Sequence, residues 1–400
     1  MKLKILQIVY AFYPPYNESG NSRVAYGISK ALALKGHDVT VYTTNVLSRD
    51  KMFELKKQVY NIHNVRVHYC KNILYKPYLP IPLFFSKDLL SKIKESLMKY
   101  DIVHTHEYRF YISPLIYFYA KRFRIPYIVQ AHGSLSRIGP KQSLKWLFDA
   151  LFGYRLLRNA AKVIALSRVE AEQYKVMGVP EEKIAIIPNG IDLSEYAELP
   201  PKGFFKKKFS ISEDKKIILY LGRIHKTKGI EFLIKAYAYL KNKMNFKDAV
   251  LVIAGPDDGY LSEVKSLVHN LGISSSVLFT GLLSEIDKIR AYVDSDVVVN
   301  VEPSNVYGLV PLEAAACSTP VIVSSTNAIS EVVATGEFGY SVKYGDVISL
   351  ASMLHRVLSN KELTEILGRN GRKYIFSNFG WNKIIEKYEQ VYTNVINGKR

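Results

Sequence analysis

Two basic residues stand where a strand gives way to a helix in the second half of the chain. Arg223 and Lys228 lie five residues apart in the segment LGRIHKTKG, after an apolar run that predicts a buried strand. Arginine can bind phosphate oxygens with a two-pronged donor, and lysine adds a mobile point charge. We therefore expect this loop to neutralise a diphosphate in place of a divalent metal, the alternative being a solvated basic loop.

A second candidate site follows the apolar run 297–301. A turn at Pro303 and Ser304 leads to Gly308 and then to a predicted helix that carries Glu313. Free backbone N–H groups and the positive end of a helix dipole suit a phosphate there, and Glu313 could accept hydrogen bonds from two ribose hydroxyls. The alternative is an ordinary strand–helix–strand crossover with a solvated glutamate, because one glycine-rich loop is a weak signal.

In the first half, three histidines lie at the ends of predicted strands: His104 and His106 in DIVHTHE, and His132 in QAHG. The alternation of side chains along its strand turns His104 inward, so we interpret it as structural. His106 stands at the strand terminus, where it could donate a hydrogen bond to a developing oxygen charge. Metal binding by these histidines is the alternative, and we predict neither a metal site nor a cofactor.

The first strand–helix loop, AFYPPYNESG, ends at Gly20, and Gly36 is a natural stop for the helix that follows. In open α/β sheets ligands lie at the carboxyl ends of the strands, so we expect this loop to face a ligand. The helix should bury four apolar side chains: Val24, Ile28, Ala31 and Leu32.

Apolar runs alternate with helical patterns twice over, which predicts an α/β fold of two doubly wound parallel sheets. The predicted strands lie near residues 4–10, 38–43, 65–70, 102–105, 126–131, 162–166, 184–188, 216–221, 250–254, 276–280, 296–301 and 320–324.

Two domains follow from this pattern: residues 1–195, and residues 196–379. Twin prolines and a lysine run between residues 199 and 208 are typical of a connector. The tail, 372–396, has apolar residues at helical spacing, which predicts a final amphipathic helix over about 380–400.

Composition narrows the function classes. The 400 residues carry a formal charge of +19, which nucleic acid, an anionic membrane or phosphorylated substrates could explain. No nucleic-acid-binding motif appears, so we expect no nucleic-acid partner. No apolar run reaches the ~18 residues that cross a bilayer, and the N-terminus lacks a signal-peptide cleavage site. Cys70 and Cys317, both in apolar segments, favour a reducing, cytoplasmic location without disulfides.

The order of these motifs resembles that of the retaining GT-B glycosyltransferases of family 4, the group that includes bacterial phosphatidylinositol mannosyltransferases and sucrose synthases. Their donor-site pattern, roughly P-S-x-x-E-G-F-G-L-x-x-L-E-A, is similar to PSNVYGLVPLEA at residues 303–314. The basic loop matches the family's G-R-x-x-x-x-K-G. AGP at 254–256 and FTG at 279–281 stand in the family's order.

The resemblance implies two Rossmann-like domains facing a cleft, with the C-terminal helix crossing back onto the first. It also implies transfer of a hexosyl group, with retention, from a UDP- or GDP-linked sugar to a hydroxyl of a glycan or lipid-linked acceptor. The catalytic residues it implies are His106, Arg223, Lys228 and Asn305. The donor-binding residues it implies are Gly20, Arg223, Lys228, Gly255, Thr280, Gly281, Tyr307, Gly308, Leu309 and Glu313.

One position departs from the family: Asn305 stands where its first glutamate is expected. An amide can hydrogen-bond a sugar hydroxyl but cannot act as a nucleophile, or as a base near pH 7. Glu302 is the alternative carboxylate if the loop is shifted. A nucleotide-sugar epimerase, which needs no acceptor, and a non-catalytic nucleotide- or RNA-binding protein on the same fold are the alternative functions.

A basic and aromatic stretch between residues 137 and 162 suggests a membrane. It holds one acid, Asp149, and an apolar stripe around Trp146, a combination that suits a helix lying in a bilayer interface. We expect peripheral contact with the inner face of the cell membrane, the alternative being a stripe that packs on the sheet. The six cations are Arg137, Lys141, Lys145, Arg155, Arg158 and Lys162.

Overall fold

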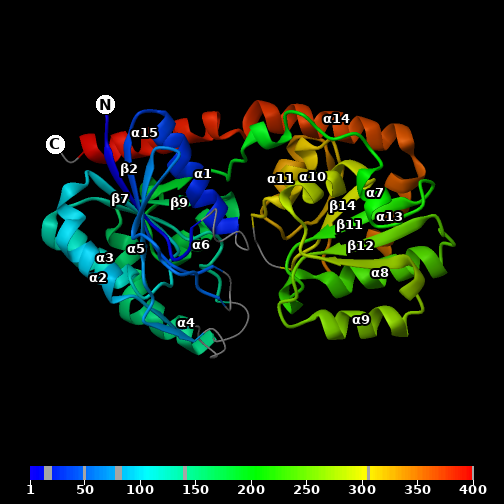
Figure 1. Ribbon diagram of the computed structural model, residues 1–400, viewed down its shortest axis with the longest axis horizontal. Helices are drawn as coiled ribbons and strands as arrows, with labels where there is room; N and C mark the ends of the chain where they lie inside the picture. The colour runs from blue at the N-terminus through cyan, green and yellow to red at the C-terminus, as the bar shows by residue number, and fades with distance from the viewer. Residues whose placement is uncertain (13–19, 48–50, 77–82, 138–141, 304–306, 399–400) are drawn as a thin grey trace. The chain divides into compact units, whose positions relative to one another are not determined.

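The computed structural model describes residues 1–12, 20–47, 51–76, 83–137, 142–303 and 307–398 (Figure 1). The chain forms two compact units. The first contains Met1–Gly190 together with Trp381–Arg400, and the second contains Ile191–Gly380. The C-terminal segment therefore returns to the first unit.

The first unit is built on an eight-stranded sheet with the order β10-β9-β8-β7-β1-β2-β4-β3. All neighbouring strands are parallel except β3 and β4. The strands are β1 (Lys4–Ile8), β2 (Asp38–Thr44), β3 (Val59–Ile62), β4 (Val65–Cys70), β7 (Ile102–His106), β8 (Tyr127–Gln130), β9 (Lys162–Ala165) and β10 (Ile184–Ile186). A separate antiparallel pair is formed by β5 (Leu74–Lys76) and β6 (Leu83–Phe85).

Helices cover both faces of this sheet (Figure 1). On one face lie α1 (Gly20–Leu34) and α15 (Trp381–Asn397); on the other lie α2 (Lys87–Ser96), α3 (Ser113–Phe123), α5 (Tyr154–Asn159) and α6 (Arg168–Val176). Between β8 and α5 come α4 (Gln142–Phe148) and one π-helical turn, η2 (Asp149–Gly153). Helices α1 and α15 approach closely, because a Cβ on Gly27 would lie 2.2 Å from the Trp381 ring.

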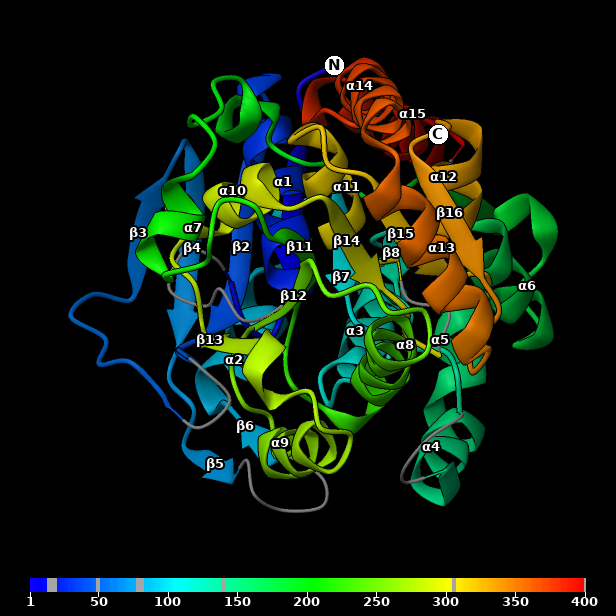
Figure 2. The same ribbon diagram turned by 90° about the vertical axis from the view of Figure 1, so that its right-hand side faces the viewer.

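The second unit is a six-stranded, wholly parallel sheet with the order β13-β12-β11-β14-β15-β16. Its strands are β11 (Lys216–Leu221), β12 (Ala249–Ala254), β13 (Val277–Gly281), β14 (Val297–Asn300), β15 (Val321–Ser324) and β16 (Gly339–Val342). Figure 2 shows α8 and α13 side by side, and both pack into one core with α9. The helices are α7 (Phe204–Lys208), α8 (Ile230–Asn242), α9 (Leu261–Asn270), α10 (Glu285–Asp294), α11 (Val310–Ala316), α12 (Ser330–Thr335), α13 (Val347–Ser359) and α14 (Lys361–Asn378).

Each sheet has a switch point, where the chain leaves two neighbouring strands toward opposite sides. In the first sheet it lies between β1 and β7, and in the second between β11 and β14. Open α/β sheets bind their ligands at the carboxyl ends of the strands at such a point.

The twelve predicted strands are confirmed, apart from shifts of one or two residues at their ends. Strands β3, β5, β6 and β16 were not predicted; β3 is a short antiparallel edge strand, so the first sheet is not wholly parallel. The buried positions predicted for α1 are confirmed. Cys70 and Cys317 are free and buried, as expected.

One local prediction is wrong. Residues 204–208 form α7 instead of a connector, because Phe205 is fully buried and Asp294 accepts hydrogen bonds from three backbone N–H groups at the start of the helix. The final helix predicted over about 380–400 is confirmed as α15 (Trp381–Asn397), and a separate helix, α14, ends just before it at Asn378. Within the described ranges, no helix is long and apolar enough to cross a bilayer.

Candidate active site

The loops after β11, β12 and β13 are joined by backbone hydrogen bonds. The Gly222 N–H donates to Ala254 O at 2.9 Å, and the Gly255 N–H donates to Gly281 O at 2.8 Å. A Cβ at Gly255 would lie 1.9 Å from Gly222 O, and its φ of +144° also requires glycine. These contacts bring Arg223, Gly255, Thr280 and Gly281 to one edge of the second unit.

Arg223 and Lys228 of the basic loop both have acidic partners. The Arg223 guanidinium, 45% exposed, forms an ion pair with Asp258. Lys228 Nζ lies 2.9 and 2.8 Å from the two oxygens of Glu302, a residue just beyond β14. Gly229 holds this loop against β14, because a Cβ there would lie 2.1 Å from Val301 O. The Lys228–Glu302 pair thus spans the switch point of the second sheet.

Glu313 lies in the first turn of α11 and is buried, only 5% exposed. Its Oε2 accepts a hydrogen bond from Tyr292 OH at 2.8 Å, and Lys288 Nζ lies 3.4 Å from Oε1. A ribose bound at Glu313 would therefore share these oxygens with two side chains of α10. Of the other residues in this segment, Tyr307 is buried, and Gly308 and Leu309 come directly before α11. Asn305 lies outside the described residues.

Three histidines of the first unit, His104, His106 and His132, lie together in a largely buried network. His106 Nε2 lies 2.6 Å from Gln7 Oε1, and His106 Nδ1 lies 2.9 Å from His132 Nε2. His104 Nδ1 is hydrogen-bonded to Tyr392 OH of α15 at 2.7 Å. His104 thus connects the sheet to the returning helix, and both ring nitrogens of His106 are engaged inside the first unit. Gly20 begins α1, at the other side of the switch point.

All three rings are uncharged at neutral pH. Burial lowers the pKa of His104 and His132 to about 3. Burial, together with the neighbouring His104 and His132, holds the pKa of His106 well below its usual value. His106 can therefore exchange hydrogen bonds but brings no positive charge to a developing oxyanion.

Sequence reasoning did not single out Glu107, the residue directly after β7. Its backbone has φ of +91°, and its carboxyl accepts a hydrogen bond from Asn21, the second residue of α1. Burial raises the pKa of Glu107 to about 8. Its position in the sequence could have identified it. Glu107 directly follows a predicted strand, and open α/β sheets bind their ligands at the carboxyl ends of the strands.

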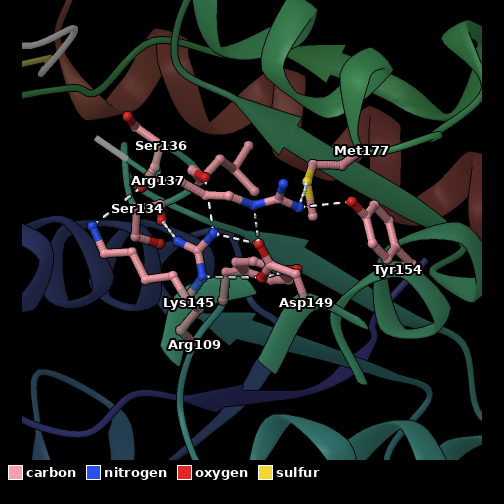
Figure 3. Close-up of polar contacts among 10 residues, drawn as sticks. Arg109, Ser134, Ser136, Arg137, Lys145, Asp149, Tyr154 and Met177 are labelled. Atoms are coloured by element: carbon pink, nitrogen blue, oxygen red, sulfur yellow. Dashed lines mark hydrogen bonds and ion pairs between the residues drawn. The ribbon is translucent and has the colours of Figure 1, made fainter. Parts of the chain in front are cut away.

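Asp149 is the centre of a buried ion cluster at the start of η2 (Figure 3). Its Oδ1 accepts from Tyr108 OH at 2.8 Å, and its Oδ2 accepts from Arg109 Nη2 and Arg137 Nε, both at 2.8 Å. Burial alone would raise the pKa of Asp149, but the hydrogen bonds from Arg109, Arg137 and Tyr108 outweigh it and lower that pKa. Arg137 is therefore committed to Asp149, which corrects its expected place among the cations presented to a membrane.

Two α/β units built on mainly parallel sheets, each with its candidate residues at the carboxyl ends of the strands, are the arrangement of the GT-B fold. The model of the family described as "Glycosyl transferases group 1" matches residues 201–374, and that of "Glycosyltransferase Family 4" matches residues 19–195. The chain belongs to this group 1, family 4 glycosyltransferase family, and it is a transferase enzyme.

Relatives with assigned activities in their names match most or all of the chain. It is 29% identical over 413 residues to the N-acetyl-alpha-D-glucosaminyl L-malate synthase of Bacillus anthracis, covering 100% of both chains. It is 30% identical over 314 residues to the UDP-Gal:alpha-D-GlcNAc-diphosphoundecaprenol alpha-1,3-galactosyltransferase of Escherichia coli, covering 75% of this chain and 77% of the relative. Among solved structures, Anabaena HepE in complex with UDP-glucose has a TM-score of 0.76 at 18% identity, covering 98% of this chain and 100% of HepE. At that identity the likeness shows the fold alone.

Proposed function

We propose that this protein transfers a hexosyl group, with retention, from a nucleotide-diphosphate sugar to a hydroxyl of a lipid-linked acceptor. The observation that supports it most is the pair of cations, Arg223 and Lys228, at the switch point of the second sheet. Both are held there by carboxylates, and a diphosphate would compete with Asp258 and Glu302 for them.

The second unit would hold the donor. Arg223 and Lys228 would neutralise the leaving diphosphate, so that no metal or cofactor is needed, and Glu313 would take the ribose. Backbone groups at Gly255, Thr280 and Gly281 would line the base, and those of residues 307–309 would face phosphate and sugar. Family membership and the placement of these residues at strand ends support these roles.

The first unit would hold the acceptor, with Gly20 and His106 at its own switch point. Asn305 would hydrogen-bond the transferred sugar but could not attack it, because an amide is no nucleophile. This favours a displacement on one face of the sugar, in which the acceptor C–O bond forms as the sugar–phosphate bond breaks. The acceptor proton then passes to the leaving phosphate.

A donor and acceptor screen tests this function. We expect release of nucleoside diphosphate from one UDP-, GDP- or ADP-sugar, strongest with α-D-GlcNAc-diphosphoundecaprenol in vesicles and weaker with L-malate or a maltooligosaccharide. The first two acceptors are the compounds in the relatives' names. Activity should survive EDTA, because the cations act in place of a metal.

Three results would contradict parts of this proposal. A strict requirement for Mn²⁺ or Mg²⁺ would overturn metal independence. Conversion of the sugar without any acceptor would favour the epimerase, and donor binding without turnover would favour a binding protein.

An exposed apolar and basic surface around α4 supports the proposal of a lipid-linked acceptor at an anionic membrane. Helix α4 buries none of its residues, and residues 144–152 leave five large apolar side chains 44–57% exposed: Leu144, Trp146, Leu147, Leu151 and Phe152. The exposure of these five side chains argues against a stripe that packs wholly on the sheet, although Phe148 of the same stretch contacts the core of the first unit. Arg155 and Arg158 are exposed directly after it. Apolar side chains beside cations, on a protein of charge +19, are complementary to an anionic bilayer interface.

Co-sedimentation with vesicles measures this contact. We expect binding that rises with the share of anionic phosphatidylglycerol and falls with salt. Arg155→Ala should weaken it about fivefold, since one cation near such a surface contributes ~1 kcal/mol. Leu147→Glu with Leu151→Glu should abolish it, whereas Ile348→Glu, a change at an equally exposed residue of α13, should not. Absence of binding at low salt, or equal binding to neutral vesicles, would leave a soluble saccharide as the better acceptor.

A further inference from the structure

Side chains bridge both switch points. In the second unit the bridge is Lys228 to Glu302. In the first unit it is Asn21 to Glu107, because Asn21 is the second residue of α1, which comes after β1, and Glu107 directly follows β7. The Asn21–Glu107 bridge therefore lies where an open α/β sheet binds its ligand. None of the donor-binding roles proposed for the second unit involves it.

Glu107 holds this place in an unfavourable backbone conformation. Its φ of +91° lies in a region that non-glycine residues rarely adopt, and a hydrogen bond from its N–H to Gln130 O, 2.9 Å, fixes it there. His132, at the end of the neighbouring strand β8, has φ of +50°. Strained residues of this kind concentrate at functional sites, where the surrounding structure imposes the conformation.

The Glu107 carboxyl has polar neighbours but no charged partner in the described part of the chain. Asn21 donates to it, and the rings of His106 and His132 close by along the strand ends are uncharged. Glu170 differs, since its two oxygens accept from the backbone N–H groups of Gly133 and Leu166 at 2.6 and 2.7 Å. Glu170 is thus occupied by the fold, whereas Glu107 keeps hydrogen-bonding capacity at the switch point.

The protonation state of Glu107 determines which hydrogen bonds it offers to a ligand. Burial raises its pKa to about 8, against the opposing effect of the Asn21 hydrogen bond, so the carboxyl is mostly protonated at pH 7. A protonated carboxyl offers one O–H donor and one carbonyl acceptor. It exchanges two hydrogen bonds with an acceptor sugar and does not repel an anionic group beside that sugar.

We infer that Glu107 is a ligand of the acceptor, binding it in the neutral form through a pair of hydrogen bonds at the first switch point. The inference rests on the proposed function. It assigns binding of the acceptor substrate to a residue that has no proposed role in binding the sugar nucleotide. It makes acceptor binding weaken as pH rises through about 8, when the carboxyl ionises and repels an anionic acceptor.

Two substitutions separate hydrogen bonding from charge. Glutamine has the same shape and keeps a donor and an acceptor, so Glu107→Gln should hold the KM for α-D-GlcNAc-diphosphoundecaprenol within about threefold at pH 7 and remove its rise above pH 8. Leucine keeps the size but exchanges no hydrogen bond, so Glu107→Leu should raise that KM roughly 10- to 100-fold. The donor KM should not change in either variant. Glu95→Gln, on exposed α2 surface, is the control.

Stability provides a readout without any substrate. The folded pKa of Glu107 lies above the ordinary carboxyl value, so the wild type loses stability as pH rises toward and through 8. Glu107→Gln does not ionise. Its Tm should therefore exceed that of the wild type at pH 9, with a smaller difference at pH 5.

The outcomes divide clearly. An unchanged acceptor KM in Glu107→Leu, with wild-type turnover present, overturns the inference and leaves the proposed function standing. An equal rise of the acceptor KM in Glu107→Gln and Glu107→Leu, or no gain in Tm for Glu107→Gln at pH 9, contradicts binding through the neutral carboxyl. Absence of turnover in the wild type with every donor and acceptor overturns the proposed function, and the inference with it.

Discussion

Lys228→Ala and Arg223→Ala should each lower kcat by ~10²–10³ with a sugar nucleotide, the loss typical when one donor to a developing anion is removed. Both cations follow β11, and Lys228 is fixed at the switch point by both oxygens of Glu302. Steady-state assays of nucleoside diphosphate release measure the effect. Lys226→Ala is the matched control, because Lys226 is an exposed cation of the same loop and should keep wild-type turnover.

Lys228→Ala also leaves Glu302 buried without its partner, which could damage the loop itself. The double variant Lys228→Ala, Glu302→Gln removes that unpaired charge. Turnover that stays low in the double variant assigns the loss to the missing cation, and turnover that returns assigns it to local misfolding. Near-normal kcat in both single variants would show that the donor site lies elsewhere.

Glu302→Gln by itself decides between the two interpretations of the departure at Asn305. With Asn305 at the sugar and Glu302 only positioning Lys228, the variant should retain turnover within about tenfold. Loss of all turnover with donor binding intact would make Glu302 the carboxylate of the site, as the shifted-loop alternative holds.

Asp149→Asn should lower the free energy of unfolding by about 3–5 kcal/mol at neutral pH, because two guanidinium groups lose their buried counter-charge. Asparagine keeps the shape and one acceptor oxygen, so the loss reports charge and not volume. Chemical denaturation followed by a probe in the first unit measures it. Glu172→Gln is the control, since its ion pair with Lys175 is on the surface and should matter little.

The pH dependence of this difference has a fixed sign. The pKa of Asp149 is lowered in the folded state, so its contribution is complete above the ordinary aspartate value and is lost as pH falls through the folded pKa. Wild type and Asp149→Asn should therefore converge in acid, below about pH 4. Equal stability at pH 7, or a difference that grows in acid, would contradict the role of the cluster.

Asp149→Asn should also weaken the binding of the α4 surface to vesicles, because Asp149 begins the turn that follows α4.

The sequence was sufficient to place most of the strands and to locate the basic loop directly after β11. Apolar runs that alternate with helical patterns are a local property of the sequence, so twelve strands could be placed from them. Short strands outside the strand–helix alternation, such as β3 and β5, could not, because each pairs antiparallel with the next strand instead of leading into a crossover helix. The lysine run 206–208 misled for a related reason: the residue that makes it a helix is Asp294, far away in the chain.

For the site, the sequence by itself determined which residues could bind a phosphate, because guanidinium, ammonium and glycine chemistry needs no partner to be recognised. Only the tertiary structure decided how they are used. It paired Lys228 with Glu302, closed the hydrogen-bonding nitrogens of His106 onto Gln7 and His132, and set Glu107 against Asn21. Charge state and hydrogen bonding depend on groups that are close in space but distant in the chain, and burial, which no single residue type encodes, sets their strength.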